Sequence, residues 1–152
     1  MGAEERVKAL GIELPAGSSP VGNYVSAVRS GSLLFLAGHG PLRADGAMVQ
    51  GKVGHDLDVA AAKDAARLVG LSLLTTLRRE LGSLDEVERI VKVLGMVNCA
   101  PGFNHTPAVI DGCSDLLVEV FGEAGRHARS AVGMAELPFD IPVEIELIAE
   151  VR

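Results

Sequence analysis

A run of nine residues close to the end of the chain, 143–151, reads VEIELIAEV. Its odd-numbered positions are all aliphatic, and three of the four positions between them are glutamates. Because successive side chains of a strand point to opposite faces, this alternation predicts a half-buried β-strand. Glu144 and Glu146 are therefore expected to project from the face opposite the apolar one.

A second informative stretch, Arg129-Ser130-Ala131-Val132, lies upstream of this strand, with Leu137-Pro138 between the two. It predicts another strand over residues 130–136. If the two strands are neighbours, Arg129 and Glu144 meet at one site, and the arginine keeps the glutamate ionised. The donor fork of an arginine suits a substrate carboxylate and a glutamate can hold a water, so the pair suits hydrolysis of a small acid. A solvated arginine and an ordinary exposed strand carboxylate remain the alternatives at this level.

The rest of the chain predicts an α+β fold. Leucines and alanines recur at three- and four-residue steps over residues 56–81, and a similar apolar stripe covers residues 107–121, so both stretches are expected to be long amphipathic helices. Hairpins at both ends with strand–helix alternation between them favour a mixed sheet with both long helices on one face. The other strands are expected at residues 24–29, 33–37 and 90–97, with a short one at 47–49.

The N-terminal part differs in composition from the rest of the chain. Residues 3–10 favour a helix that Gly11 ends, and residues 15–20 are rich in proline, glycine and serine, as loops are. We therefore expect an N-terminal extension of short helix and loop at residues 1–19. A single domain is expected over residues 20–152, in keeping with the total length of 152 residues.

Composition excludes several classes of function. The formal net charge is −6 and aromatic residues make up 3% of the chain, which disfavours nucleic acid as a partner. Cys99 and Cys113 form no zinc pattern and are expected as reduced, packed thiols, while the histidines show no metal-binding spacing. No apolar run approaches the ~18 residues of a membrane span. We expect a cytoplasmic protein without a membrane partner, a metal or a cofactor.

Several motifs in this order resemble the RidA (YjgF) family of enamine/imine deaminases. They are Arg129-Ser130, the fifteen-residue step from there to Glu144, the segment Gly22-Asn23-Tyr24-Val25 and the turn Ala37-Gly38-His39-Gly40-Pro41. The resemblance covers roughly residues 20 to 152. It implies a chorismate-mutase-like α+β domain that forms a homotrimer with sites in the clefts between subunits.

The resemblance also implies roles for individual residues. Arg129 would bind the substrate carboxylate, Glu144 would orient the attacking water and Tyr24 would supply an aromatic contact near the substrate. Tyr24 packed at a subunit interface is the alternative. Gly38 matches a glycine whose backbone lies close to the ligand, which the lack of a Cβ permits. His39 lies beside it and, like His127 near Arg129, is a side chain that titrates near neutrality.

Three positions depart from the family pattern. Ala37 stands where many members have serine, and Ala131 stands where they often have cysteine. Ser114 aligns with a helix position that an asparagine usually occupies, and we expect it to contact the substrate together with Ala131. These changes alter the polar lining of the pocket more than the scaffold.

Two functions are consistent with this pattern. The first is hydrolysis of 2-enamine and 2-imine acids to 2-keto acids and ammonia, which needs positioning rather than a cofactor or a nucleophilic triad. The second is a non-catalytic trimer that binds a small carboxylate. Retention of Arg129 and Glu144 favours the first, and the alanines at 37 and 131 favour the second. A ribonuclease is disfavoured by the acidic charge.

Overall fold

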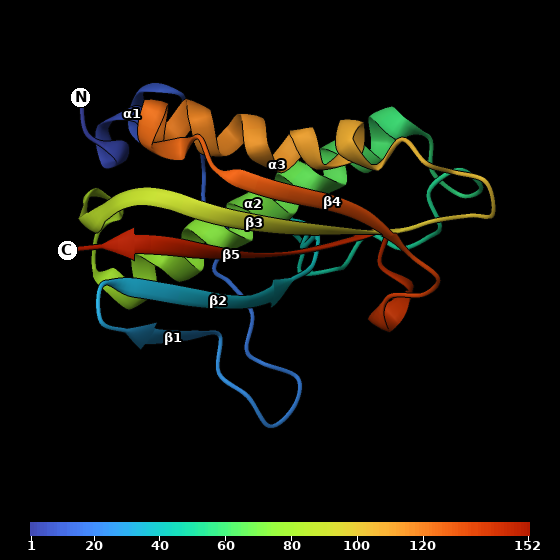
Figure 1. Cartoon of the computed structure of the whole chain (residues 1–152), viewed down its shortest axis with the longest axis horizontal. Helices are drawn as coiled ribbons and strands as arrows, with labels where there is room; N and C mark the ends of the chain where they lie inside the picture. Colours follow the sequence, from blue (N-terminus) through green and yellow to red (C-terminus); the bar gives the residue numbers. More distant parts are fainter.

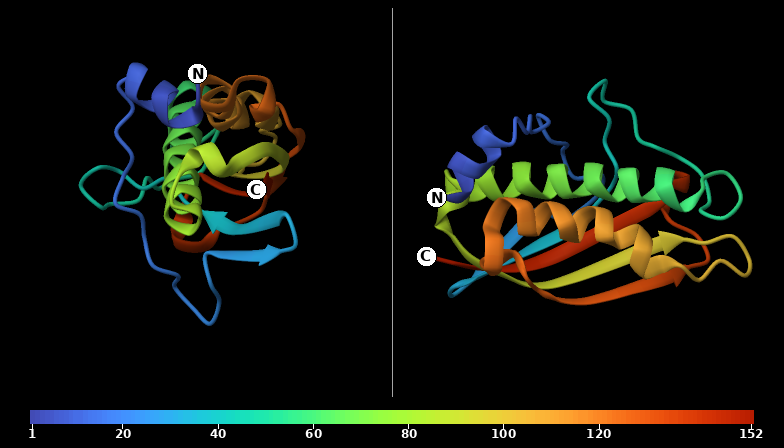
Figure 2. Two further views of the ribbon diagram at one scale, coloured as in Figure 1. Left: turned by 90° about the vertical axis from the view of Figure 1, so that its left-hand side faces the viewer. Right: turned by 90° about the horizontal axis from the view of Figure 1, so that it is seen from above.

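A sheet and two long helices form the two layers of the molecule. The computed structural model describes residues 1–152. Seen from above, α2 (Val59–Leu81) and α3 (Thr106–Phe121) cover one face of the sheet and leave the other face bare (Figure 2). The strands are β1 (Ala27–Ser30), β2 (Leu33–His39), β3 (Val87–Asn98), β4 (Ala128–Met134) and β5 (Val143–Val151).

The sheet is mixed, as the sequence predicts. Its strand order is β1-β2-β5-β3-β4, with β3 and β4 parallel and the other pairs antiparallel (Figure 1). Helix α3 makes the crossover between the two parallel strands. Strand β5 spans the predicted residues 143–151, and its apolar positions are buried while its glutamates are partly exposed. The predicted α+β architecture is confirmed.

The two helices pack closely because small residues lie at their contact. A Cβ atom at Gly112 of α3 would collide with the carbonyl oxygen of Lys63 on α2. A Cβ at Gly70 would lie 2.8 Å from a methyl group of Leu116. Under the helices, the core is almost entirely aliphatic, as expected for a chain with so few aromatic residues. No helix combines the length and the apolarity that a membrane crossing requires.

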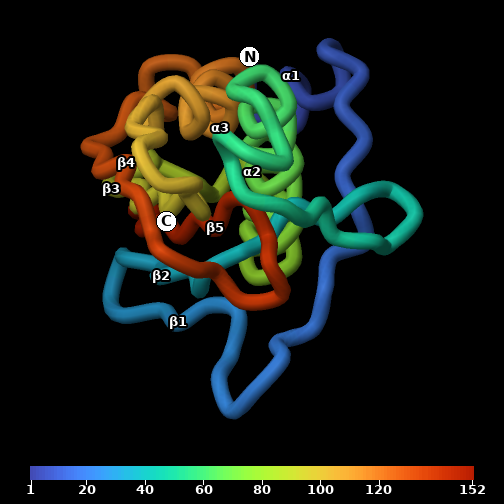
Figure 3. The backbone as a smooth tube through the Cα atoms, turned by 90° about the vertical axis from the view of Figure 1, so that its right-hand side faces the viewer, coloured from blue at the N-terminus to red at the C-terminus, as the bar shows by residue number.

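The N-terminal segment is joined to this core. Helix α1 (Ala3–Ala9) buries Ala3 and Val7 in the hydrophobic cluster, and Glu4 forms an ion pair with Arg78 of α2 at 2.6 Å. From there the chain descends past α2 towards β1 (Figure 3). The Thr75 hydroxyl on α2 donates to the carbonyl oxygen of Pro15 at 2.8 Å, which holds this descending segment in place.

Some predicted boundaries are wrong. β1 begins at Ala27 rather than at residue 24, because residues 21–24 bend, with Gly22 at a φ of 152°. No strand forms at residues 47–49, where one isolated bridge joins Leu42 to Met48. Helix α2 starts at Val59 because the Asp58 side chain caps it by accepting from the backbone N–H of Ala61.

Candidate functional site

The predicted site residues fall into two groups. The first, which we call the Glu144 pocket, is a cavity of about 520 Å³ that contains Glu144, Gly38, His39 and Tyr24. The segment 18–21 and the side chains Met48, Pro138, Phe139 and Ile141 complete most of its wall. The second group, which we call the Arg129 network, lies between α3 and β4 and contains Arg129, Ser114 and His127.

Glu144 lies directly against the backbone of β2. A Cβ atom at Gly38 would lie 2.5 Å from Oε2 of Glu144, so any residue other than glycine would displace the carboxylate. The approach of the Gly38 backbone to a ligand, expected from the resemblance, stays a prediction. Burial raises the pKa of Glu144, and the neighbouring Glu146 carboxylate raises this pKa further. The Glu144 carboxyl therefore holds its proton to a higher pH than an ordinary glutamate does.

His39 forms part of the pocket wall with both ring nitrogens already bonded. Nδ1 lies 2.6 Å from the carbonyl oxygen of Ala37, and Nε2 lies 2.7 Å from the hydroxyl of Thr76 on α2. Since the carbonyl only accepts, Nδ1 carries the proton and Nε2 accepts from the threonine. Burial lowers the pKa of His39, which favours this neutral form. His39 thus ties β2 to α2.

Tyr24 stands at the mouth of the pocket with about half of its surface exposed. Its hydroxyl accepts a hydrogen bond from the backbone N–H of Val21 at 3.3 Å, which closes the local bend that precedes β1. The ring is therefore fixed by its own neighbours in the chain. No group of three or more His, Cys, Asp or Glu side chains is arranged to hold a metal ion.

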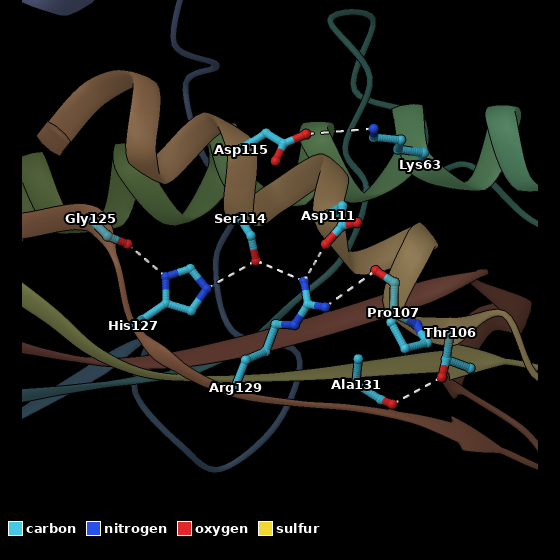
Figure 4. A network of polar contacts seen from close by, with 10 residues as sticks. All are labelled: Lys63, Thr106, Pro107, Asp111, Ser114, Asp115, Gly125, His127, Arg129 and Ala131. Carbon is cyan, nitrogen blue, oxygen red and sulfur yellow. Dashed lines mark hydrogen bonds and ion pairs between the residues drawn. The ribbon is translucent and has the colours of Figure 1, made fainter. Parts of the chain in front are cut away.

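Arg129 is held from above by helix α3 (Figure 4). Its Nη1 donates to Oδ1 of Asp111 at 2.8 Å and to Oγ of Ser114 at 3.1 Å, while Nη2 makes a long contact of 3.4 Å with the carbonyl oxygen of Pro107. Nε makes no hydrogen bond. The edge formed by Nε and Nη2 therefore has donor capacity left for a planar partner such as a carboxylate, and we call it the open edge; the whole side chain is 22% exposed.

The Arg129 network continues from Ser114 to His127. Nε2 of His127 lies 2.9 Å from the Ser114 hydroxyl, and Nδ1 lies 2.7 Å from the carbonyl oxygen of Gly125 (Figure 4). Because the carbonyl fixes the proton on Nδ1, the serine donates to His127 and accepts from Arg129. Burial, and then the charge of Arg129, lower the pKa of His127 and keep its ring neutral. The Gly125 carbonyl thus sets the direction of each hydrogen bond from His127 through Ser114 to Arg129.

The predicted meeting of Arg129 with Glu144 does not occur within one chain. Their strands are not neighbours, since β3 lies between β4 and β5. Arg129 lies opposite Val93 of β3, which in turn lies opposite Leu147 of β5. Val93 and Leu147 are buried under the helices, so Arg129 projects from the face that the helices cover.

Glu144 projects from the other face. It lies opposite Met96 of β3, and Met96 lies opposite Val132 of β4. Val132 is 39% exposed and belongs to the bare face of the sheet. The prediction that a neighbouring arginine keeps Glu144 ionised is therefore wrong for a single chain, in which burial has the opposite effect. Ala131 belongs with the Arg129 network, and its carbonyl accepts from the Thr106 hydroxyl at 2.9 Å.

Two residues near these groups were missed from the sequence. Asp111 precedes Ser114 by three residues, a spacing that places both on one face of α3, and this spacing was an available signal. Phe139 lines the Glu144 pocket although it lies in the loop between β4 and β5. It adopts a left-handed backbone conformation without glycine, so no sequence signal marks it.

Comparison with known proteins assigns the family. The model of the family described as "YjgF/chorismate_mutase-like, putative endoribonuclease" matches residues 4–151. Protein TCP17 of Trypanosoma cruzi is 42% identical over 147 residues, which cover 96% of this chain and 92% of that protein. A crystal structure described as a putative endoribonuclease from Shewanella oneidensis has a TM-score of 0.95 at 34% identity and covers 99% of this chain and 100% of that one.

A third relative has a defined activity in its name. The 2-iminobutanoate/2-iminopropanoate deaminase of Dermatophagoides farinae is 29% identical over 142 residues, which cover 93% of this chain and 95% of that protein. The family and fold expected from the sequence are both confirmed by these matches.

Proposed function

This chain belongs to the RidA/YjgF family, and we propose that it hydrolyses 2-enamine and 2-imine acids to 2-keto acids and ammonia in clefts between neighbouring copies. The observation that carries the proposal is the state of Glu144. It is the one carboxylate in the wall of the pocket, lies against the Gly38 backbone and has no ion-pair partner in the chain. A half-buried acid without a partner is destabilising, and such groups are concentrated at functional sites.

A second copy would complete the site. Arg129 lies near one edge of the sheet, on β4, and the Glu144 pocket lies towards the other edge, at the end of β2. Contact of one edge with the opposite edge of the next copy is heterologous and closes into a ring when the rotation allows it. The bare face offers apolar surface for this contact, including Phe35 opposite Ile148 and the exposed Val132. We propose a homotrimer on this basis.

In such a cleft, each group has a distinct task. The open Nε and Nη2 edge of Arg129 binds the substrate carboxylate. The Glu144 carboxylate accepts a hydrogen bond from a water and takes its proton as the water oxygen bonds to C2 of the imine. The C=N double bond becomes single, and the proton passes from Glu144 to the nitrogen. The new hydroxyl group then gives its own proton to Glu144, which passes it to the amino nitrogen; the C=O bond forms as the C–N bond breaks, and ammonia leaves.

The raised pKa of Glu144 suits this proton transfer. A carboxylate with a raised pKa is a stronger base than an ordinary glutamate, so it accepts a proton from the attacking water more readily. The imine already hydrolyses in water without help. Positioning by Arg129 and Glu144 is therefore enough for a useful rate, and the site needs neither a nucleophile nor a cofactor.

Binding without catalysis is the second function to consider. It is favoured by one observation: Arg129 already has a resident carboxylate, Asp111, at 2.8 Å. A substrate carboxylate would have to share the guanidinium with it. A ribonuclease is less consistent with the site, because no lysine or arginine lines the pocket and the chain carries a net charge of −6.

The two functions separate in one experiment. An amino-acid oxidase or a dehydratase generates the imines in situ, and release of the 2-keto acid is measured in competition with semicarbazide, which traps the imine. A deaminase lowers the yield of semicarbazone in proportion to its concentration. A protein that binds a stable 2-keto acid but hydrolyses no imine faster than buffer is a receptor, and the proposed activity then fails.

A further inference from the structure

Phe139 is an aromatic residue held in an unfavourable position at the Glu144 pocket. The residue is 64% exposed, and its φ of 60° is followed by a φ of 55° at Asp140. Left-handed backbone in residues other than glycine costs roughly 1–3 kcal/mol each and persists only where the surroundings enforce it. The chain thus accepts both backbone strain and an exposed apolar ring at this one place.

The surroundings that enforce this turn come from other parts of the fold. The Gln50 side chain donates to the carbonyl oxygen of Phe139 at 2.8 Å. The backbone N–H of Gly51 donates to the carbonyl oxygen of Asp140 at 2.7 Å. The fully buried Asn98 donates to the Asp140 carboxylate at 3.2 Å and to the carbonyl oxygen of Ile141 at 3.1 Å. These bonds hold the backbone of the turn, whereas the Phe139 ring is largely exposed and is not one of the side chains packed on the hydrophobic core.

The ring belongs to an apolar part of the pocket wall. A Cβ at Gly40 would lie 3.1 Å from Cε of Met48 and 3.3 Å from Cδ1 of Ile141, so both side chains lie beside Gly40. Phe139 is two residues before Ile141 and lines the same cavity. Glu144 lies against Gly38, and Gly40 is two residues further along the chain. Two residues span at most about 7 Å, so Gly38 and Gly40 are no further apart than this. An apolar surface therefore begins one side-chain length from the proposed reaction centre.

Size and charge restrict what this surface can hold. The pocket volume of about 520 Å³ falls in the range of roughly 300–1,000 Å³ that suits drug-sized ligands, far above the needs of an alanine-derived imine. The side chain of a neighbouring arginine would fill only part of it. Glu144 is the only aspartate, glutamate, lysine or arginine in the wall. A second carboxylate on the substrate would find no partner there and would be repelled by Glu144.

Building on the proposed function, we propose that the preferred substrates are 2-imino acids with a large uncharged side chain, aliphatic or aromatic. Phe139, Met48 and Ile141 receive that side chain, and Phe139 is the specificity-determining residue. Imines derived from alanine are too short to reach the ring, and those derived from glutamate carry the wrong charge. The strain at residues 139 and 140 is the cost of presenting the ring to the substrate.

The test compares imines generated by an L-amino-acid oxidase from phenylalanine, leucine, alanine and glutamate. The intact protein should hydrolyse the first two with a kcat/KM about tenfold or more above that for the alanine imine, since burial of a larger apolar group in a fitting pocket favours the transition state by this order. Phe139→Ala should remove most of this preference, because it should lower kcat/KM for the phenylalanine and leucine imines far more than kcat/KM for the alanine imine. Leu10→Ala, which removes an exposed apolar side chain outside the pocket, is the matched control and should change nothing.

A second variant excludes an effect of the loop itself. Phe139→Asn removes the ring but supports left-handed backbone, which asparagine tolerates. It should lose the preference as Phe139→Ala does. Equal kcat/KM for all four imines in the unmodified protein, or an unchanged preference in both variants, would overturn the proposal.

Binding separates failure of this proposal from failure of the proposed activity. Phenylpyruvate, a stable 2-keto acid, should bind about tenfold or more tightly than pyruvate in calorimetry, and Phe139→Asn should abolish the difference. If no imine is hydrolysed but this binding preference holds, the activity is wrong and the apolar subsite is right. If imines are hydrolysed but the two keto acids bind equally, the subsite is wrong and the activity stands.

Discussion

The Glu144 pocket and the Arg129 network are built by opposite means. Around Arg129, side chains hold side chains: Asp111 and Ser114 accept hydrogen bonds from Arg129, and Ser114 donates to His127. Around Glu144, the backbone shapes the site: Gly38, which has no Cβ, leaves room for the carboxylate, and the strained turn at residues 139–140 presents Phe139 to the pocket. The first group has a positive charge with an open edge, and the second has an unpaired negative charge. The Arg129 network thus offers a cationic donor for a carboxylate, and the Glu144 pocket offers an acceptor for a water.

The largest expected effect comes from breaking the Glu144 side. If Glu144 orients water, Glu144→Gln should lower turnover by about 10² to 10⁴, the usual range for a positioned acid–base group, and retain most of the affinity for a 2-keto acid. Turnover is corrected for spontaneous hydrolysis, and the oligomeric state is checked for both proteins. Glu150→Gln is the control, because Glu150 lies on the same face of β5 outside the pocket wall. Equal turnover in Glu144→Gln and the unmodified protein would make Glu144 structural.

Mixing two inactive variants asks whether the groups come from different copies. Arg129→Ala and Glu144→Gln chains, coexpressed with different tags, should assemble into mixed rings. Random mixing restores both side chains in about one site in four, so activity should recover to about a quarter of that of the unmodified protein. Either variant alone should stay inactive. No recovery in isolated mixed assemblies would mean that Arg129 and Glu144 do not share an inter-subunit site.

The sequence predicts the residues of the Glu144 pocket and of the Arg129 network, but not that the two groups lie apart in one chain. Alternation defined the limits of β5 and the outward face of Glu144, because a half-buried strand must alternate whatever surrounds it. The predicted adjacency of Arg129 and Glu144 was wrong because β3, which precedes both strands in the chain, inserts between β4 and β5. Strand order depends on tertiary packing of the whole sheet, and local patterns carry no record of it.

Other features were hidden for a different reason. Asp111 looks like any exposed carboxylate on a helix until α3 is placed over β4, where it meets Arg129. Phe139 adopts a positive φ angle that a bulky residue disfavours, so its propensity points away from the structure that forms; Asp140, which also has a positive φ, tolerates it better. Local preference fails where hydrogen bonds from distant segments, here Gln50 and Asn98, override it.

Arg129→Lys probes the geometry of the Arg129 network at constant charge. A lysine cannot present two parallel donors to a carboxylate, and it cannot bond Asp111 and Ser114 while it offers an open edge. Affinity for a 2-keto acid, and kcat/KM with it, should fall by about tenfold or more, with the fold and assembly retained. Circular dichroism and sedimentation serve as controls. Unchanged kinetics would assign Arg129 to an ordinary surface role.

The smallest effect concerns a feature that the two regions share, a partly buried neutral histidine. Burial lowers the pKa of His39 and of His127 below the ordinary value of 6.5, so the unfolded chain binds more protons than the folded chain as the pH falls below that value. The stability that the two neutral rings contribute is thus fully present above about pH 6.5 and is lost progressively as the pH falls towards their folded pKa values. Each such histidine adds a slope of at most about 1.4 kcal/mol per pH unit.

Replacing His39 separates its share from that of His127. His39→Gln keeps an amide able to bond Ala37 and Thr76 but cannot titrate, so stability measured by urea unfolding should decline less steeply between about pH 7 and pH 5 than in the unmodified protein. His127→Gln in the same background should make the decline less steep again, by the share that His127 contributes. Replacing His127 should lower the catalytic rate more than replacing His39 does. His127 bonds Ser114 next to Arg129, whereas His39 ties β2 to α2. A stability profile that is equally steep in His39→Gln and the unmodified protein would show that His39 is not held neutral by burial, and the pocket wall would then be more open to water than its hydrogen bonds indicate.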